Sequence, residues 1–315
     1  MSSHPQQEFL DAPIPERWGF IQRAKNTILY YLIRFFFWLI SLTPFIAAKL
    51  FGVLLGYLAY WLVFTERNKA LSQLAIAFPE KSQAQREILA KRMFVHLGIA
   101  CAEVTHIPTL LKRDDLKLNS SHRAIFDEAL KEGKGCIAVT GHIGNWELLA
   151  QVLAANNIPI HTIAKPVYDP RLTRWAHSNR TQFGLNVIWR GQRGGFKEML
   201  RVFHQKEALA LLIDQDTNVQ SVFVPFFGKA AATPAAVGVL ASRTKAPIIV
   251  GWLQRQNNGY QLNFERFEYQ LSGEKTTDIQ AITAGVTQRL EWAIRQAPEQ
   301  WVWMHHRWKT RPPKE

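Results

Sequence analysis

The sequence predicts an α/β protein with a mostly parallel central sheet flanked by helices, preceded by an N-terminal hydrophobic, membrane-anchoring helical segment. Three observations lead to this prediction. Residues 28–64 contain only two charged side chains. From residue 135 onward, short apolar runs alternate with stretches of helical periodicity, which is typical of a parallel sheet covered by helices. The chain of 315 residues is also long enough to bury a substantial core.

The hydrophobic segment comes first in the chain. Its two charges are Arg34 and Lys49, and neither uncharged run reaches the roughly 20 residues that a spanning helix needs. Arg34 would therefore lie near the end of a spanning helix, where its head can reach water. Pro44 predicts a kink or a break, because proline cannot continue a helix without losing a hydrogen bond.

Three arrangements of this segment remain open. One is a spanning helix near residues 26–46, followed by a helix that lies on the membrane. The second is a hairpin that enters the membrane from one face, which suits the basic residues on both sides of the segment (Arg23, Lys25, Arg67 and Lys69 among them). The third is a buried pair of hydrophobic helices in a soluble domain.

The rest of the chain predicts helices and then alternating elements. Residues 67–80 and 82–106 carry apolar residues at three- and four-residue intervals, which indicates two helices. We expect strands at 135–140, 158–164, 185–189, 207–213, 221–227, 246–253 and 260–268. We expect helices at 145–156, 169–183, 194–205, 232–243 and 276–296, and a loose, basic C-terminal segment.

Charge and cysteine content limit the class of protein. The formal net charge of +13 points to an anionic partner such as lipid headgroups or an acidic protein. Nucleic acid is not expected, because interleaved basic and aromatic patches are missing. Cys101 and Cys136 fit neither a metal spacing nor a disulfide framework, so both are expected to be small buried apolar residues.

The stretch VTGHIGNWELL (139–149) joins a predicted strand to a predicted helix. Gly141 and Gly144 permit a tight turn, and Asn145 is a good helix N-cap. Reactive groups in α/β proteins lie at the carboxyl ends of parallel strands. The turn can bring His142 toward Glu147, whose carboxylate would accept the Nδ1 proton and make Nε2 more basic. This pair is a general base and its orienting partner without a protein nucleophile.

Other interpretations of the turn are weaker. His142 and Glu147 could ligate a metal, but no third ligand clusters with them, so no metal is predicted. A histidine that only satisfies backbone groups is the structural alternative. The chain has no GxSxG nucleophile elbow, Walker loop or GxGxxG motif, which argues against a serine hydrolase and against nucleotide binding.

Two further stretches carry candidate substrate-binding residues. Arg190 and Arg193 follow an apolar strand beside glycines, a setting in which the planar guanidinium suits a phosphate. Asp214 and Asp216 follow the buried run ending at Ile213. They either cap a turn or bind substrate hydroxyls or Arg190.

These motifs in order resemble a known family. The pattern HxxxxE at 142–147, GLNVIWR at 184–190, DQD with SVFVPFFG over 214–228 and PEQWVWMHHRWKTRP at 298–312 are similar to the late acyltransferases (lauroyl and myristoyl transferases) of lipid A biosynthesis. That family lies within the lysophospholipid acyltransferase superfamily. The resemblance extends from about residue 28 to 313.

The resemblance implies a glycerolipid acyltransferase-like fold, with a tail and membrane anchor over 1–65 and an acyltransferase catalytic domain over 66–315. It implies a protein of the cell inner membrane with its catalytic domain on the cytoplasmic side. Such enzymes move a fatty acyl chain from acyl carrier protein onto a hydroxyl of a lipid A precursor, without an acyl-enzyme intermediate or a cofactor. Acyl-coenzyme A as donor, and another lysophospholipid or glycolipid as acceptor, are the alternatives.

Residue roles follow from the same resemblance. His142 would act as the base and Glu147 as its acidic partner. Arg190, together with Arg174, would bind an anionic group of the substrate. Asp214 and Asp216, as argued above from their position, are candidates for contact with substrate hydroxyls or with Arg190. The basic C-terminal residues Arg307, Lys309 and Arg311 would add attraction for an anionic acceptor.

Overall fold

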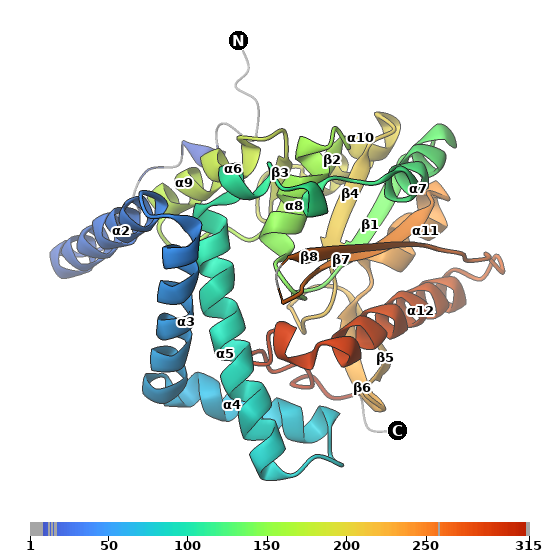
Figure 1. Ribbon diagram of the computed structural model, residues 1–315. Helices are drawn as coiled ribbons and strands as arrows, with labels where there is room; N and C mark the ends of the chain where they lie inside the picture. The colour runs from blue at the N-terminus through green and yellow to red at the C-terminus, as the bar shows by residue number, and fades with distance from the viewer. Residues whose placement is uncertain (1–8, 12, 14, 16–17, 258, 313–315) are drawn as a thin grey trace.

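The computed structural model describes residues 9–11, 13, 15, 18–257 and 259–312 (Figure 1). A six-stranded sheet in the order β3-β2-β4-β1-β7-β8 forms its centre. Neighbouring strands are parallel except for β8, which pairs antiparallel with β7. The strands are β1 (Cys136–Thr140), β2 (Ile160–Ala164), β3 (Asn186–Trp189), β4 (Ala208–Leu212), β7 (Ile248–Arg255) and β8 (Tyr260–Phe267). The predicted mostly parallel sheet is therefore confirmed.

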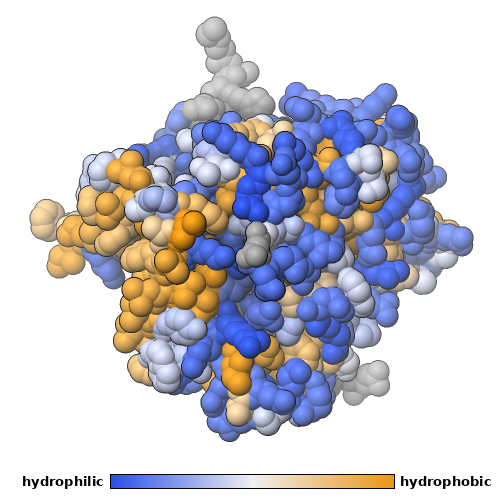
Figure 2. Space-filling model, viewed as in Figure 1, coloured by the Kyte–Doolittle hydropathy of each residue, from blue (hydrophilic) through white to orange (hydrophobic). Residues whose placement is uncertain are grey.

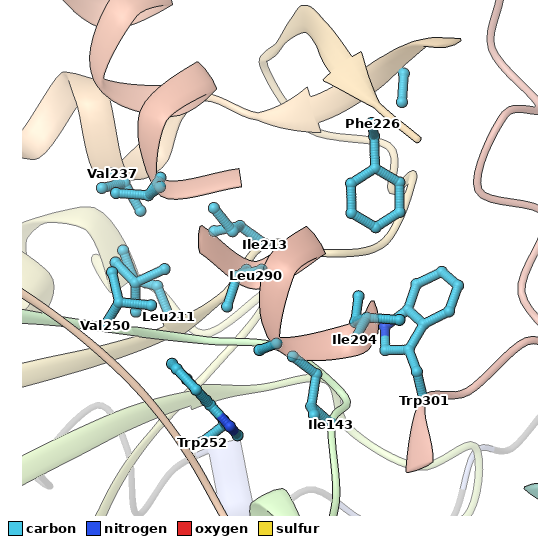
Figure 3. Packing of buried hydrophobic residues seen from close by; sticks show 14 of the residues in the cluster. Ile143, Leu211, Ile213, Phe226, Val237, Val250, Trp252, Leu290, Ile294 and Trp301 are labelled. Atoms are coloured by element: carbon cyan, nitrogen blue, oxygen red, sulfur yellow. The ribbon is translucent and has the colours of Figure 1, made fainter. Parts of the chain in front are cut away.

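Helices cover both faces of this sheet. On one face, Phe126 of α7 and Leu153 of α8 pack with Ala138 and Ala210. The opposite face is covered by α10, α11 and α12, whose apolar side chains pack onto Leu211 and its neighbours (Figure 3). The bounds are α7 (Ser120–Lys131), α8 (Trp146–Ala155), α9 (Pro170–Thr181), α10 (Gly195–His204), α11 (Ala236–Thr244) and α12 (Lys275–Gln296), with short 3₁₀ turns η1 (Asp114–Leu116) and η2 (Pro298–Gln300).

A separate two-stranded hairpin contains one strand that the sequence did not predict. Strand β5 (Ser221–Phe226) was expected, but β6 (Lys229–Pro234) covers residues that were partly assigned to a helix beginning at 232. That helix, α11, begins at Ala236. Phe227 and Gly228 both have positive φ, as the tight two-residue hairpin turn requires. Pairing with β5 therefore overrides the helical preference of the alanine run.

The N-terminal hydrophobic segment forms two helices that point in different directions, α2 (Phe20–Ser41) and α3 (Phe45–Leu62) (Figure 1). The break predicted at Pro44 is confirmed, since α2 ends at Ser41 and Pro44 caps α3, so the first helix does not reach residue 46 as expected. Of the helices in the described ranges, α3 alone is long and apolar enough to cross a membrane. Further along the chain follow α4 (Phe64–Ala77), α5 (Gln83–Thr105) and the short α6 (Ile107–Leu110).

The apolar side chains of α2 and α3 form a hydrophobic surface (Figure 2). Leu50, Leu54 and Leu58 on α3 and Phe35 and Trp38 on α2 are all exposed. The alternative of a buried helix pair in a soluble domain is therefore wrong. An apolar surface of this size marks a site of membrane or protein contact.

Helix α3 is joined closely to α5 by glycines. A Cβ atom built on Gly52 would lie 2.5 Å from the carbonyl oxygen of Gly98, and one on Gly98 would lie 2.0 Å from that of Gly52. Gly56 meets the backbone of Val95 in the same way. Helix α3 precedes the expected domain boundary at residue 65 and α5 follows it, so the two expected domains are in backbone contact. The boundary itself stays a prediction.

Two smaller expectations fail. Arg307 was expected on a basic, loose C-terminus, but its side chain is buried and donates to the carbonyl oxygen of Ala232 and the hydroxyl of Thr233. Burial lowers its pKa to about 10. It holds the hairpin and offers no surface charge to a ligand. Cys136 is buried as expected, whereas Cys101 is exposed.

Candidate active site

The turn between β1 and α8 places His142 at the carboxyl end of the central strand. Gly144 has φ of +60°, and a Cβ on it would lie 1.6 Å from the carbonyl oxygen of Leu253. A Cβ on Gly141 would lie 2.9 Å from the carboxyl of Asp214. Both glycines are therefore required by close approach. The Asn145 side chain accepts from the amide of Leu148 at 3.0 Å and begins α8, as predicted.

Asp214 is the carboxylate that binds the histidine. Thr140 of β1 pairs with Leu212 of β4 in parallel register, so His142 and Asp214 each lie two residues beyond a paired position. The Nδ1 atom of His142 lies 2.9 Å from Oδ1 of Asp214. The backbone amide of His142 and the indole Nε1 of Trp301 donate to Oδ2 at 2.6 and 2.7 Å.

This arrangement determines the state of the imidazole. Burial opposes the charged form of both groups, yet their pairing outweighs burial, so the pKa of Asp214 is lowered and that of His142 is raised. Glu147 adds to the rise in the pKa of His142. Because Asp214 is ionised and accepts at Oδ1, Nδ1 of His142 is the protonated nitrogen. In the neutral ring Nε2 then carries a free lone pair.

Glu147 does not bind His142, contrary to the geometric expectation. Its carboxylate accepts two hydrogen bonds from Arg180 of α9, from Nε at 2.9 Å and from Nη2. Glu147 lies in the first turn of α8 and faces α9, whereas the β1–β4 pairing already places Asp214 at Nδ1. The Glu147 hydrogen bonds raise the pKa of Arg180 against the effect of its burial. Whether Glu147 takes part in catalysis stays a prediction.

A buried network of polar side chains, centred on Arg255, contacts the turn between β1 and α8. Arg255 donates to both carboxylate oxygens of Glu103 at 2.6 Å and to Nδ1 of His96 at 2.5 Å. Nε2 of His96 then donates to the carbonyl oxygen of Gly144 at 3.0 Å. Burial and the Arg255 charge lower the pKa of His96 to about 3, so this ring is neutral. Glu103 also accepts from the Asn145 side-chain amide at 2.9 Å, so α5 holds the end of the turn at Gly144 and Asn145.

A mainly apolar cavity of about 170 Å³, with His142 among its lining residues, lies between the sheet and helices α7 and α8. Small residues leave this space open on the sheet and on α8, among them Ala138, Ala210, Gly251 and Ala150. Phe126 and Phe264 also line it, with ring centroids 5.1 Å apart. The cavity suits an extended hydrocarbon chain whose head group lies beside the histidine.

The remaining candidate residues lie elsewhere. Arg190 follows β3, which is separated from β1 by two strands, or roughly 14 Å at ordinary strand spacing. Arg174 donates to the carbonyl oxygen of Leu10. Asp216 accepts from the amide and hydroxyl of Thr310 and so holds the C-terminal segment. None of the three lines the cavity at His142. Their roles in substrate binding stay predictions.

Sequence reasoning missed two residues of this site. Arg180 lies near the end of a predicted amphipathic helix, and nothing in its local sequence distinguishes it from the other arginines there. Trp301 lies within one of the recognised motifs, but its hydrogen bond to Asp214 depends on tertiary folding. Within the described ranges, no group of three or more His, Cys, Asp or Glu could hold a metal ion.

The fold and the site together define an α/β acyltransferase. The family model for the bacterial lipid A biosynthesis acyltransferases matches residues 20–310. A lipid A biosynthesis acyltransferase of Haemophilus influenzae is 26% identical over 291 residues, 88% of this chain and 86% of that protein. The lipid A biosynthesis palmitoleoyltransferase of Escherichia coli is 27% identical over 293 residues, 87% of this chain and 89% of that protein.

A similarity over a shorter stretch is to the phosphatidylinositol mannoside acyltransferase of Mycolicibacterium smegmatis, 25% identical over 182 residues, 57% of this chain and 59% of that protein. The family match covers most of the chain. The protein therefore belongs to the bacterial lipid A biosynthesis acyltransferase family and is an O-acyltransferase.

Proposed function

We propose that this protein transfers a fatty acyl chain from acyl carrier protein to a hydroxyl of a lipid A precursor, on the cytoplasmic side of the inner membrane. The observation that carries the proposal is the free Nε2 of His142 beside an apolar cavity. A chain held in that cavity has its thioester carbonyl next to the only nitrogen of the ring that can accept a proton.

The proposed reaction is a direct transfer. Nε2 of His142 takes the proton of the acceptor hydroxyl while that oxygen attacks the thioester carbonyl. Asp214 stabilises the imidazolium that forms. The carbon–sulfur bond then breaks, and the imidazolium returns the proton to the leaving thiolate.

Charge supports the choice of donor. The protein has a formal net charge of +13, and an acidic carrier protein would be attracted to it. Such attraction between exposed charges weakens as salt is added. The KM for acyl carrier protein thioester should therefore rise with ionic strength, whereas a preference for the coenzyme A thioester would contradict this donor.

The exposed apolar helices support the location. We infer that α3, together with the exposed apolar side chains of α2, holds the protein in the inner membrane. The catalytic domain then faces the cytoplasm, where carrier protein is present. Fractionation of cells that express the full chain and a chain without residues 1–65 tests the role of this segment.

The acceptor is tested by mass spectrometry of lipids from cells without the gene. Lipid A that lacks one secondary acyl chain is the expected result. The similarity to a phosphatidylinositol mannoside acyltransferase makes a glycosylated phospholipid the second candidate. Unchanged lipid A together with another lipid that lacks a chain would replace the first candidate with the second.

A further inference from the structure

A second cavity, of about 450 Å³, lies between α2, α9 and the junction of α5 and α6. It is a groove whose outer part is formed by side chains of α2 and whose inner part reaches the first turns of α8. The lining residues that matter here are Arg34, Trp38, Ser41, Trp175, Glu147 and Arg180. Contacts of α2 with α9 build its wall, since Phe37 packs edge-on against Trp175 with centroids 4.7 Å apart.

The groove and the cavity at His142 share one boundary. Glu147 and Arg180 line both of them, so their ion pair lies where the two spaces meet. A ligand in the groove therefore approaches the reaction centre from a different side than a hydrocarbon chain in the first cavity. In an acyl transfer reaction, the acyl chain of the donor and the acceptor lipid must both reach the reaction centre, and two separate spaces allow this.

The outer part of the groove combines an apolar surface with one cation. Phe35, Phe36 and Leu39 beside it are exposed. The guanidinium of Arg34 donates to the hydroxyl of Tyr30 at 2.9 Å, and no carboxylate pairs with it among the described residues. At the inner end the charge of Arg180 is already neutralised by Glu147. Arg34 is thus the guanidinium that remains for an anionic group.

We propose that this groove binds the lipid acceptor, with an anionic phosphate group on Arg34 and acyl chains along the exposed apolar side of α2. The acceptor hydroxyl then passes the Glu147–Arg180 pair to reach His142. The identity of the acceptor rests on the proposed function, whereas the location of its binding site rests on the groove. Arginine suits this role because its planar fork binds phosphate oxygens with two hydrogen bonds.

The first test compares Arg34→Ala and Arg34→Lys with Lys25→Ala, a change of a cation on the same helix that does not line the groove. The substrate is a phosphorylated glucosamine disaccharide lipid. Arg34→Ala should raise the acceptor KM roughly 10- to 100-fold, the usual effect of a lost charge-assisted hydrogen bond. The donor KM should not change, and Arg34→Lys should recover part of the loss. With the dephosphorylated lipid, the wild type and Arg34→Ala should have equal KM values.

A second test fills the groove without changing its charge. Ser41→Phe should raise the acceptor KM at least tenfold and leave the donor KM unchanged, with Ser41→Ala as its control. Equal acceptor KM values for Arg34→Ala and Lys25→Ala, or for Ser41→Phe and Ser41→Ala, would overturn the assignment of the groove. If the wild type instead acylates another lipid, the proposed acceptor fails, and the same variants then test the groove with that lipid.

Discussion

The turn after β1 and the helices α2 and α3 depart from ordinary burial in opposite ways. Around the turn, the charged side chains of Asp214 and Glu103 are buried. Along α3, by contrast, Leu50 is 66% exposed and Leu62 is 69% exposed. A buried charge and an exposed apolar patch are the two informative exceptions in a folded protein. Here the buried charges lie at the proposed reaction centre, and the exposed leucines lie on the surface through which we propose that the protein meets a lipid phase.

The two regions are also stabilised differently. Each buried carboxylate around the turn has several donors, since Asp214 accepts three hydrogen bonds and Glu103 binds both Arg255 and Asn145. Removing one partner would leave a buried charge uncompensated, which is strongly destabilising. The exposed leucines of α3 have no such partners, and replacing them changes contact with the surroundings. Substitutions in the two regions should therefore separate catalysis from membrane binding.

The largest effect is expected for His142→Ala. Loss of a general base typically lowers the rate about 10²- to 10⁴-fold. The protein should be less stable but stay folded and membrane-bound, because Asp214 keeps two of its three donors, the backbone amide of residue 142 and the indole of Trp301. Acyl transfer by the purified variant measures this, with thermal unfolding as the control. Activity within a few-fold of wild type would remove His142 from the role of base.

A smaller loss, roughly 10²-fold, is expected for Asp214→Asn, because an amide cannot stabilise the imidazolium. This variant also tests the pH dependence. The raised pKa of His142 keeps the ring protonated to higher pH, so kcat/KM in the wild type should rise through a midpoint above 6.5. Without the Asp214 charge, the midpoint should move to lower pH. An unmoved midpoint would show that another group controls this titration.

For Glu147→Gln we expect a loss of roughly tenfold or more in kcat, since Arg180 would lose its counter-ion beside the reaction centre. The comparison with Asp214→Asn is decisive for the two acidic candidates. If Glu147 is the partner of His142 during catalysis, as the sequence predicted, Glu147→Gln should move the pH midpoint as well. A double-mutant cycle with Arg180→Ala separates the ion pair from any direct effect, because coupled residues give non-additive changes.

The cavity at His142 predicts a change in chain-length preference. Ala150 of α8 lines it, and Ala150→Leu places a larger side chain there without breaking the helix. The ratio of kcat/KM for a long to a short acyl thioester should fall about tenfold. The matched control is Ala155→Leu, a change at the exposed end of the same helix. An unaltered ratio would mean that the chain lies elsewhere.

The smallest effect on turnover is expected on α3. Replacing Leu50, Leu54 and Leu58 with serine should reduce the membrane-bound fraction and leave kcat on detergent-dispersed substrate within about twofold. The reason is that burying each leucine in an apolar phase contributes roughly 1.5–3 kcal/mol. The triple replacement with methionine serves as control. A serine variant that remains fully membrane-bound would show that α2 or another surface suffices.

Local sequence patterns predicted most of the fold and, in the candidate site, the turn that carries His142. Periodicity found the strands of the central sheet and the helices on its faces, and the glycines and Asn145 located the turn that holds His142. The carboxylate that lies at Nδ1 of His142 was not predicted, because its position depends on strand order, and the catalytic role of Glu147 stays a prediction. Only the pairing of β1 with β4 brings Asp214 to Nδ1, and no local pattern reveals which strands are neighbours.

Other residues were missed for related reasons. Arg180 joins the site through the packing of α9 on α8, and β6 exists because β5 lies beside it. Arg307 has the composition of a surface residue, but the fold encloses it against Phe226, with its guanidinium carbon 4.9 Å from the ring centroid. In each case a contact with another element of the fold outweighed the local preference.

The glycine contact between α3 and α5 has a consequence for which hydroxyl is acylated. At Gly52 and Gly98 the backbones of the two helices are so close that no side chain fits between them. Helix α5 also carries His96 and Glu103, which hold the turn of His142. If α3 lies in the bilayer as proposed, its depth fixes the height of Nε2 above the lipid. The enzyme would then select a hydroxyl by its distance from the membrane surface, and regioselectivity would be a property of how deeply one helix is embedded.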